Sequence, residues 1–226
     1  MDAGRDALLG LGVGNRNTVE QRYGQDYARP AHRMREYLRA LRPLLRDGEV
    51  SFRGETLVAD TGGWLARVPG SVPAPPVLVA AMGPAMLRVT GELADGTITW
   101  LAGARTIGDH VAPILHAAAE GNPAPQVIAS LPVCVTGEPD EARERAAANL
   151  AFYLNVPSYR AVLDREGASS PADVAIVGDE RYVERQIARL ADAGVTHFVA
   201  SPAGLTTAQE RQRTLELLGA LSTRGC

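Results

Sequence analysis

The feature that most constrains the fold is a regular alternation between short apolar runs and longer amphipathic segments. Five apolar runs have the length and composition of strands, at residues 7–13, 77–82, 97–101, 127–135 and 196–201. The first of them, Ala7–Val13, contains only apolar residues and glycine, which predicts a strand covered on both faces. Strands that alternate with helices form right-handed β/α units, so we expect an α/β protein with a parallel sheet.

The segments between these runs have helical patterns. A first helix is expected from Pro30, because apolar residues recur at helical spacing from Met34 to Leu45. Residues 49–76 contain short β-like runs around glycines, which indicates a hairpin and a loop. Further helices are expected at residues 84–95, 106–120, 140–154 and 179–194, and a last one after a capping box formed by Thr207 and Glu210.

Composition limits the class of protein. A chain of 226 residues that is 46% hydrophobic can build one sizeable core, so we expect a single domain over residues 1–226. The 23 Lys and Arg residues are interspersed with 26 Asp and Glu residues, and the net charge is −3. Such a pattern excludes nucleic acid as an expected partner.

Cysteine and histidine usage argues against a metal or disulfide framework. The two cysteines, Cys134 and Cys226, do not form a C-x-x-C pair, and the four histidines are dispersed without metal-ligand spacing. No apolar run is long enough to span a bilayer, and the first residues lack the positive charge of a signal peptide. We therefore expect a soluble cytoplasmic protein.

The first strand runs into a glycine-rich loop that resembles a dinucleotide motif only superficially. Its glycines, Gly10, Gly12 and Gly14, are spaced G-x-G-x-G, and Asn15 and Asn17 stand where a Rossmann fingerprint needs its third glycine. The segment that follows is polar and irregular, so no helix is expected against this loop. Two interpretations stay open: the glycines permit close strand packing, or they leave room for a flat ring.

A better phosphate site follows the second strand. This strand ends at Met82, Gly83 forms the turn, and Pro84 occupies the first helical position. The amides of Gly83, Ala85 and Met86 would then be free to bind an anion at the positive end of the helix. An ordinary strand-to-helix turn is the alternative.

Residues 83–96, "GPAMLRVTGELADG", carry the most specific part of a family resemblance. Together with the glycine-rich loop, "RMREYLRALRPLL", "VSFRGETL" and residues 177–204, this run resembles the luciferase-like family of flavin- and deazaflavin-dependent oxidoreductases. The chain is most similar to the branch that uses coenzyme F-420 and includes methylenetetrahydromethanopterin reductase. The similarity extends over nearly the entire chain.

The resemblance implies a TIM-type (β/α)8 barrel with the cofactor across its C-terminal mouth. The cofactor phosphate would lie at the turn after Met82, and the ring near the end of the first strand. Trp100 would line the pocket, or act as an aromatic plug of the barrel. The candidate cofactor-binding residues are Gly12, Gly14, Asn15, Met82, Gly83, Pro84, Ala85, Met86, Trp100 and Ser201.

In such a barrel the strand at residues 7–13 corresponds to the fourth strand. About five of eight β/α units, strands four to eight, are therefore expected here, which do not close a barrel. The first strand would present an unpaired apolar edge. We expect an N-terminally truncated relative; the alternative is a chain that pairs this edge with another, and a homo-oligomer is expected.

The resemblance also implies the chemistry. Deazaflavin enzymes transfer a hydride between the cofactor ring and a small-molecule substrate, so no protein nucleophile is required. No catalytic residue is assigned, and the substrate is not identified. The expected cofactor is coenzyme F-420, with FMN and a monooxygenase activity as the alternative. A non-catalytic remnant, or a subunit that needs a partner, is the third hypothesis.

Overall fold

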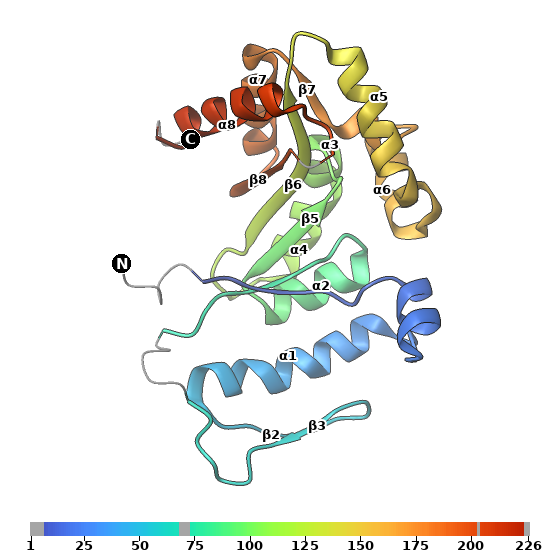
Figure 1. The fold of residues 1–226 in the computed structure, drawn as a ribbon. Helices are drawn as coiled ribbons and strands as arrows, with labels where there is room; N and C mark the ends of the chain where they lie inside the picture. Colours follow the sequence, from blue (N-terminus) through green and yellow to red (C-terminus); the bar gives the residue numbers. More distant parts are fainter. Residues whose placement is uncertain (1–6, 68–72, 203, 224–226) are drawn as a thin grey trace. The chain divides into compact units, whose positions relative to one another are not determined.

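A computed structural model describes residues 7–67, 73–202 and 204–223 (Figure 1). The chain divides into two compact units. The first comprises Met1–Ile98 and Ile114–Gln126, and the second comprises Thr99–Pro113 and Val127–Cys226. Each unit is described by itself.

The first unit contains a parallel group of strands. β1 (Leu9–Leu11) pairs with β4 (Val77–Val79), and β4 pairs with the start of β5 (Gly96–Trp100). All three residues of β4 are buried. Close approach makes glycine necessary at the start of β5, because a Cβ on Gly96 would lie 2.3 Å from the carbonyl oxygen of Gln126.

Two helices and a hairpin complete this unit. α1 (Pro30–Asp47) packs against α2 (Pro84–Leu93), and β2 (Ser51–Arg53) pairs antiparallel with β3 (Val58–Asp60). Residues 68–72 of the excursion expected at 49–76 lie outside the described residues. A short helix, η1 (Thr18–Arg22), precedes α1.

A buried carboxylate on α1 holds the hairpin. Glu36 accepts hydrogen bonds from the Thr56 hydroxyl (2.6 Å) and from the backbone N–H groups of Glu55 (2.6 Å) and Thr56 (2.7 Å). These bonds, with that of the Thr56 hydroxyl first, lower the pKa of Glu36 to about 2. The Glu36 carboxylate therefore accepts the backbone hydrogen bonds of the hairpin turn and fixes that turn to α1.

The second unit is organised around β6 (Gln126–Val135). This strand pairs parallel with β7 (Ile176–Gly178) through Val133–Val135 and with β8 (His197–Ser201) through Ile128–Pro132. Its other segments are α3 (Ala104–Thr106), η2 (Ile107–Val111), α4 (Ala112–Ala118, which runs on into the first unit), α5 (Pro139–Leu150), η3 (Ala151–Asn155), α6 (Pro157–Glu166), η4 (Pro171–Val174), α7 (Glu180–Asp192) and α8 (Ala208–Thr223).

The predicted fold class is confirmed. The five predicted strands are present as β1, β4, β5, β6 and β8, and the structure adds a sixth parallel strand, β7. Within the described residues, β1, β7 and β8 each pair with one neighbour, so the strands form an open parallel arrangement and not a closed barrel. The chain is an α/β protein of incomplete barrel type.

One prediction about the first strand is wrong. Ala7–Val13 was expected to be covered on both faces, but only Leu9–Leu11 forms the strand, and none of its residues is buried. Leu8, just before it, is 50% exposed. The physical reason is that β4 is the only element in the described residues that packs extensively against β1, so no helix covers the faces of this edge strand.

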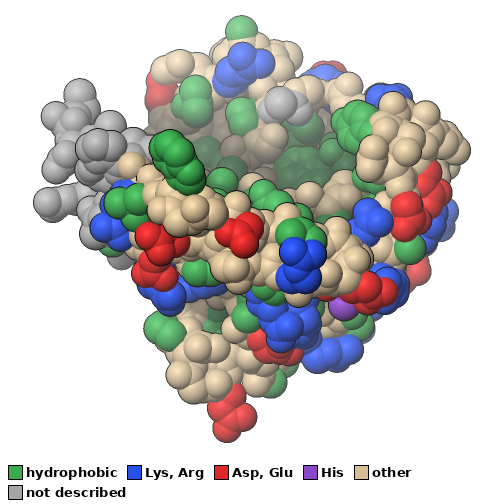
Figure 2. Space-filling model, turned by 90° about the horizontal axis from the view of Figure 1, so that it is seen from below, with side chains coloured by type: hydrophobic (Ala, Val, Ile, Leu, Met, Phe, Trp, Pro, Cys, Tyr) green, Lys and Arg blue, Asp and Glu red, His purple; other side chains and the backbone are tan. Residues whose placement is uncertain are grey.

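The described part of the chain contains no helix long and apolar enough to cross a membrane. Figure 2 shows one face of the molecule, on which basic and acidic side chains are interspersed.

Candidate functional site

The turn between β4 and α2 has the geometry of an uncapped helix N-terminus. Gly83 is the N-cap residue, with φ −88° and ψ 149°, and no side chain caps the helix. Pro84 is the first helical residue, as predicted, and the first backbone hydrogen bond of the helix runs from the Leu87 N–H to the Gly83 carbonyl (2.9 Å). By helix geometry, the amides of Ala85 and Met86 lack an intrahelical acceptor.

This turn is open to solvent. Gly83, Pro84 and Ala85 are exposed, and a Cβ built on Gly83 would meet no atom within 4 Å. The turn itself carries no acidic side chain. Two free N–H groups at the positive end of α2, with open space before them, form a suitable anion site.

The glycine-rich loop lies at the same edge of the strands. β1 and β4 are parallel and in register, and the Ala80 N–H donates to the Leu11 carbonyl (2.8 Å). A Cβ on Gly12 would lie 3.6 Å from the Ala80 Cβ, so Gly12 lies beside the end of β4. Gly14 adopts φ +66°, a conformation that favours glycine. Both interpretations of the glycines, packing and space, therefore stay open.

The expectation that no helix follows this loop is wrong. Residues 16–23 are helical, with η1 at their centre. The Asn15 Oδ1 accepts a hydrogen bond from the Thr18 N–H (3.0 Å), and its carbonyl accepts one from the Val19 N–H (3.0 Å). Asparagine is among the best N-cap residues, which is the signal that the sequence interpretation missed. The Asn15 Oδ1 is thus occupied, and its amide N–H groups remain as donors.

The remaining two candidates lie in the second unit, each at the end of its strand. Trp100 is the last residue of β5, and its ring lies 6.1 Å from the Tyr153 ring, centroid to centroid. Its Nε1 is buried and has no hydrogen-bond partner among the described residues. Ser201 is the last residue of β8, opposite Pro132 of β6.

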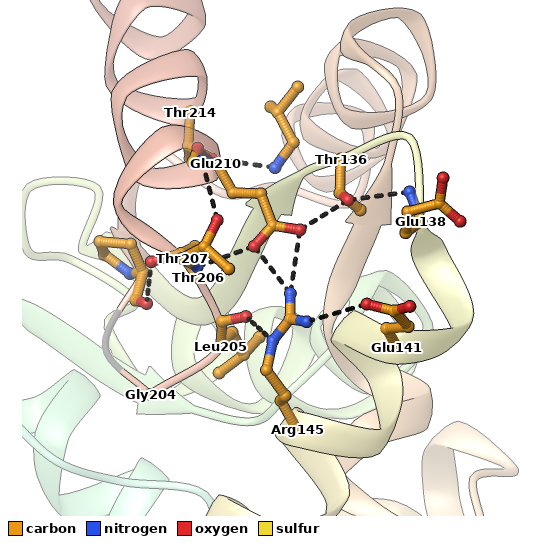
Figure 3. Close-up of polar contacts among 12 residues, drawn as sticks. Thr136, Glu138, Glu141, Arg145, Gly204, Leu205, Thr206, Thr207, Glu210 and Thr214 are labelled. Atoms are coloured by element: carbon orange, nitrogen blue, oxygen red, sulfur yellow. Dashed lines mark hydrogen bonds and ion pairs between the residues drawn. The ribbon is translucent and has the colours of Figure 1, made fainter.

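A polar network on α5 and α8 was not predicted as a unit (Figure 3). The Glu210 carboxylate accepts from Arg145 Nη2 (2.7 and 2.9 Å), the Thr136 hydroxyl (2.7 Å) and the Thr207 N–H (2.7 Å). Burial raises the pKa of Glu210, but these hydrogen bonds outweigh it and lower the pKa to about 2. Arg145 Nε also donates to the Leu205 carbonyl (2.8 Å), which ties the segment after β8 to α5.

The N-termini of α8 and α2 differ in whether a side chain caps them. The predicted capping box of α8 is confirmed, because the Glu210 N–H also donates to the Thr207 hydroxyl (3.3 Å). α8 therefore supplies its own carboxylate, whereas α2 has none. Sequence spacing identifies the capping box but not the contact with Arg145, which is 65 residues away.

A cavity of about 480 Å³ lies elsewhere in the first unit. Arg42 of α1 lines it, together with Val77, Asp95 and Gln126, which lie at the beginnings of β4, β5 and β6. None of the predicted site residues lines this cavity. Within residues 7–67, 73–202 and 204–223, no group of three or more His, Cys, Asp or Glu side chains is placed to hold a metal ion.

Comparison with known proteins identifies relatives. The chain is 32% identical over 173 residues to an uncharacterized Mycobacterium tuberculosis protein, Rv1360, covering 71% of this chain and 51% of that protein. It is 28% identical over 251 residues to a 5,10-methylenetetrahydromethanopterin reductase of Archaeoglobus fulgidus, covering 96% of this chain and 73% of the reductase. The chain thus spans about half the length of the mycobacterial relative.

Solved structures share the fold. A coenzyme F420 dependent tetrahydromethanopterin reductase from Methanopyrus kandleri has a TM-score of 0.75 at 22% identity, over 96% of this chain and 73% of that one. The oxygenating constituent of 3,6-diketocamphane monooxygenase from Pseudomonas putida, in complex with FMN, has a TM-score of 0.65 at 17% identity, over 93% and 69%.

The luciferase-like monooxygenase family matches residues 3–213. This match covers most of the 226 residues and confirms the family predicted from the run at residues 83–96. The chain belongs to the luciferase-like monooxygenase family.

Proposed function

We propose that this chain acts in an oxidoreductase that transfers a hydride between coenzyme F-420 and a small organic substrate. The A. fulgidus relative, which aligns over 96% of this chain, is named a reductase of a small organic compound. The name of the M. kandleri structure specifies F420. Membership of the luciferase-like family supports a redox activity, and these two relatives favour the deazaflavin branch of it.

The observation that carries the proposal is the uncapped N-terminus of α2. The cofactor phosphate would accept hydrogen bonds from the amides of Ala85 and Met86, with Gly83 and Pro84 forming the open turn and Met82 leading into it. Helix N-termini favour anions through these free N–H groups and through the helix dipole. Because the turn is exposed and has no carboxylate, a phosphate group fits it.

The glycine-rich loop would bind the part of the cofactor next to the phosphate. Gly12 and Gly14 present no side chain at the same strand edge, and the free amide of Asn15 offers donors to ring oxygens or nitrogens. When bound, a deazaflavin supplies the hydride chemistry. The protein residues position the cofactor. Trp100 and Ser201 remain proposed contacts on the strength of the family resemblance.

FMN is the second candidate cofactor. The P. putida structure contains FMN, and the α2 turn suits any phosphate monoester or diester. In that case the activity would be that of a flavin-dependent monooxygenase.

Equilibrium dialysis of the purified chain against F-420, FMN and riboflavin tests the proposal. Riboflavin is the matched control, because it has the ring of FMN without the phosphate. We expect F-420 to be retained most tightly, and FMN to bind more tightly than riboflavin. Retention of FMN but not F-420 would favour the monooxygenase. If neither compound is retained, this chain does not bind the cofactor by itself and the proposal fails.

A further inference from the structure

The end of β5 in the second unit carries two costly features side by side. Leu101, which follows Trp100, adopts φ +60° although it is not glycine. Its side chain is fully buried, and its N–H donates to the Ser130 carbonyl (3.2 Å). A left-handed conformation is unfavourable for a bulky residue and persists only where the surrounding structure holds it, most often at functional sites.

The second feature is the indole nitrogen of Trp100. It is buried, and no acceptor for its N–H is present among the described residues. A buried Trp N–H usually finds a hydrogen-bond partner, and each exception needs an explanation. The strained backbone of Leu101 therefore lies next to the unused buried donor of Trp100, which is the arrangement expected beside a ligand site.

The Tyr153 ring packs against Trp100, and two further rings pack against Tyr153, so Trp100, Tyr153, Phe152 and Tyr159 form an aromatic cluster. The Tyr153 ring lies 4.7 Å from that of Tyr159 at 73° and 5.7 Å from that of Phe152 at 74°, centroid to centroid. Phe152 is 60% exposed. Burial raises the pKa of Tyr159 to about 12, so its hydroxyl stays neutral. Aromatic rings favour offset-stacked or edge-to-face contact with another planar ring.

We propose that Trp100 Nε1–H donates a hydrogen bond to a carbonyl oxygen of a planar, conjugated ligand that packs on the aromatic cluster. The ligand thereby supplies the missing acceptor. Tyr153 packs against Trp100 from the short helix η3, which also carries the exposed Phe152, so rotation of side chains on η3 admits the ligand. In its cofactor form, this inference rests on the proposed function.

Two sources could supply this ligand: the carbonyl-bearing ring of the cofactor, or a substrate that is an aromatic carbonyl compound. The probes are therefore F-420 and acetophenone. The matched compound for acetophenone is 2-phenylpropene, which has the same shape with a CH2 group in place of the oxygen and accepts no hydrogen bond.

The test compares Trp100→Phe with Trp64→Phe by equilibrium dialysis. Both substitutions keep an aromatic ring and remove an indole N–H, but Trp64 is 81% exposed and serves as the matched control. The chain has two tryptophans, so Trp100 is the remaining one in the Trp64→Phe variant. Ultraviolet resonance Raman spectra of that variant therefore report the hydrogen bonding of the Trp100 indole directly.

We expect Trp100→Phe to weaken the binding of one of the two carbonyl ligands by about 3- to 10-fold. The same variant should bind 2-phenylpropene as the wild type does, and Trp64→Phe should bind both carbonyl ligands as the wild type does. Weaker F-420 binding assigns the acceptor to the cofactor, and weaker acetophenone binding assigns it to the substrate. Unchanged binding of both ligands overturns the inference, as does an indole N–H already hydrogen-bonded in the free protein. If the wild type binds no F-420, the proposed function fails, and acetophenone binding alone then tests the inference about Trp100. If the wild type binds neither ligand, both the proposed function and the inference are overturned.

Discussion

Replacing Gly83 by Asp places a carboxylate where the cofactor phosphate is proposed to bind. The backbone at Gly83 (φ −88°, ψ 149°) suits any residue, and a Cβ there meets no atom within 4 Å. An Asp side chain at this N-cap position would accept hydrogen bonds from the same amides, those of Ala85 and Met86. The substitution therefore keeps the fold and occupies the anion site.

The sizes of the two effects follow from this geometry. An Asp N-cap in place of Gly stabilises the helix by a few tenths to about 1 kcal/mol, including its interaction with the helix dipole. Two negative charges about 5 Å apart repel by about 1–3 kcal/mol for effective dielectric constants of about 80 down to 20. Because the turn is exposed, the lower part of that range applies, and repulsion alone weakens binding by about 5-fold. Together with competition for the amides, the loss is about 10-fold or more.

Gly83→Asn is the matched control, because it caps the helix in the same way without a charge. In equilibrium dialysis, the affinity for F-420 should decrease from the wild type to the Asn variant to the Asp variant. The Asn variant should bind about 3- to 10-fold more weakly than the wild type, because its side chain competes for the amides. Thermal unfolding should show both variants at least as stable as wild type. Equal affinity of all three proteins would refute the placement of the phosphate at α2.

Three further predictions concern stability. Because the pKa of Glu210 is lowered to about 2 from 4.5, its contribution to the free energy of unfolding is present above about pH 4.5 and is lost as the pH falls towards 2. Urea unfolding from pH 7 to 2 should show this loss. A Glu210→Gln variant whose stability falls equally steeply with pH would contradict it. Arg145→Ala should lower the free energy of unfolding by about 2–4 kcal/mol, because it leaves the Glu210 carboxylate without its cation. Arg143→Ala, whose ion pair is exposed, should lower it by less than about 1 kcal/mol, and equal losses in urea unfolding would contradict the prediction. Gly96→Ala should destabilise by about 1–3 kcal/mol, because the added methyl meets the backbone oxygen that begins β6, whereas Gly137→Ala meets no atom and should be neutral in calorimetry.

The strands and the α2 turn were predictable because their causes are local. Apolar runs mark β4, β5, β6 and β8, and a proline after glycine marks the start of α2. The capping box of Thr207 and Glu210 depends on a spacing of three residues, which the sequence displays. In each case one short segment contains both partners.

Features that depend on distant partners were missed. β7 has only three residues, and its register is set by Val133–Val135 of β6, about 43 residues earlier along the chain. The unpaired edge of β1 was expected from the family resemblance, but the exposure of its faces depends on which elements pack over it, which its own composition does not reveal. The helix after Asn15 was missed for a different reason, since its N-cap signal was local but lay in a segment without apolar periodicity.

The site shows the same division. Sequence located the turn at Gly83, but only the structure reveals that no side chain caps α2 and that Asn15 uses its Oδ1 on its own helix. The left-handed backbone of Leu101 and the unpaired nitrogen of Trp100 likewise follow from packing against β6 and η3.

The central claim is that the amides at the start of α2 bind the cofactor phosphate. Two-dimensional ¹H–¹⁵N NMR during a titration with F-420 observes these groups directly. We expect the Ala85 and Met86 resonances to shift downfield and those of the glycine-rich loop to shift with them. Saturable binding of F-420 with both resonances unmoved would contradict it.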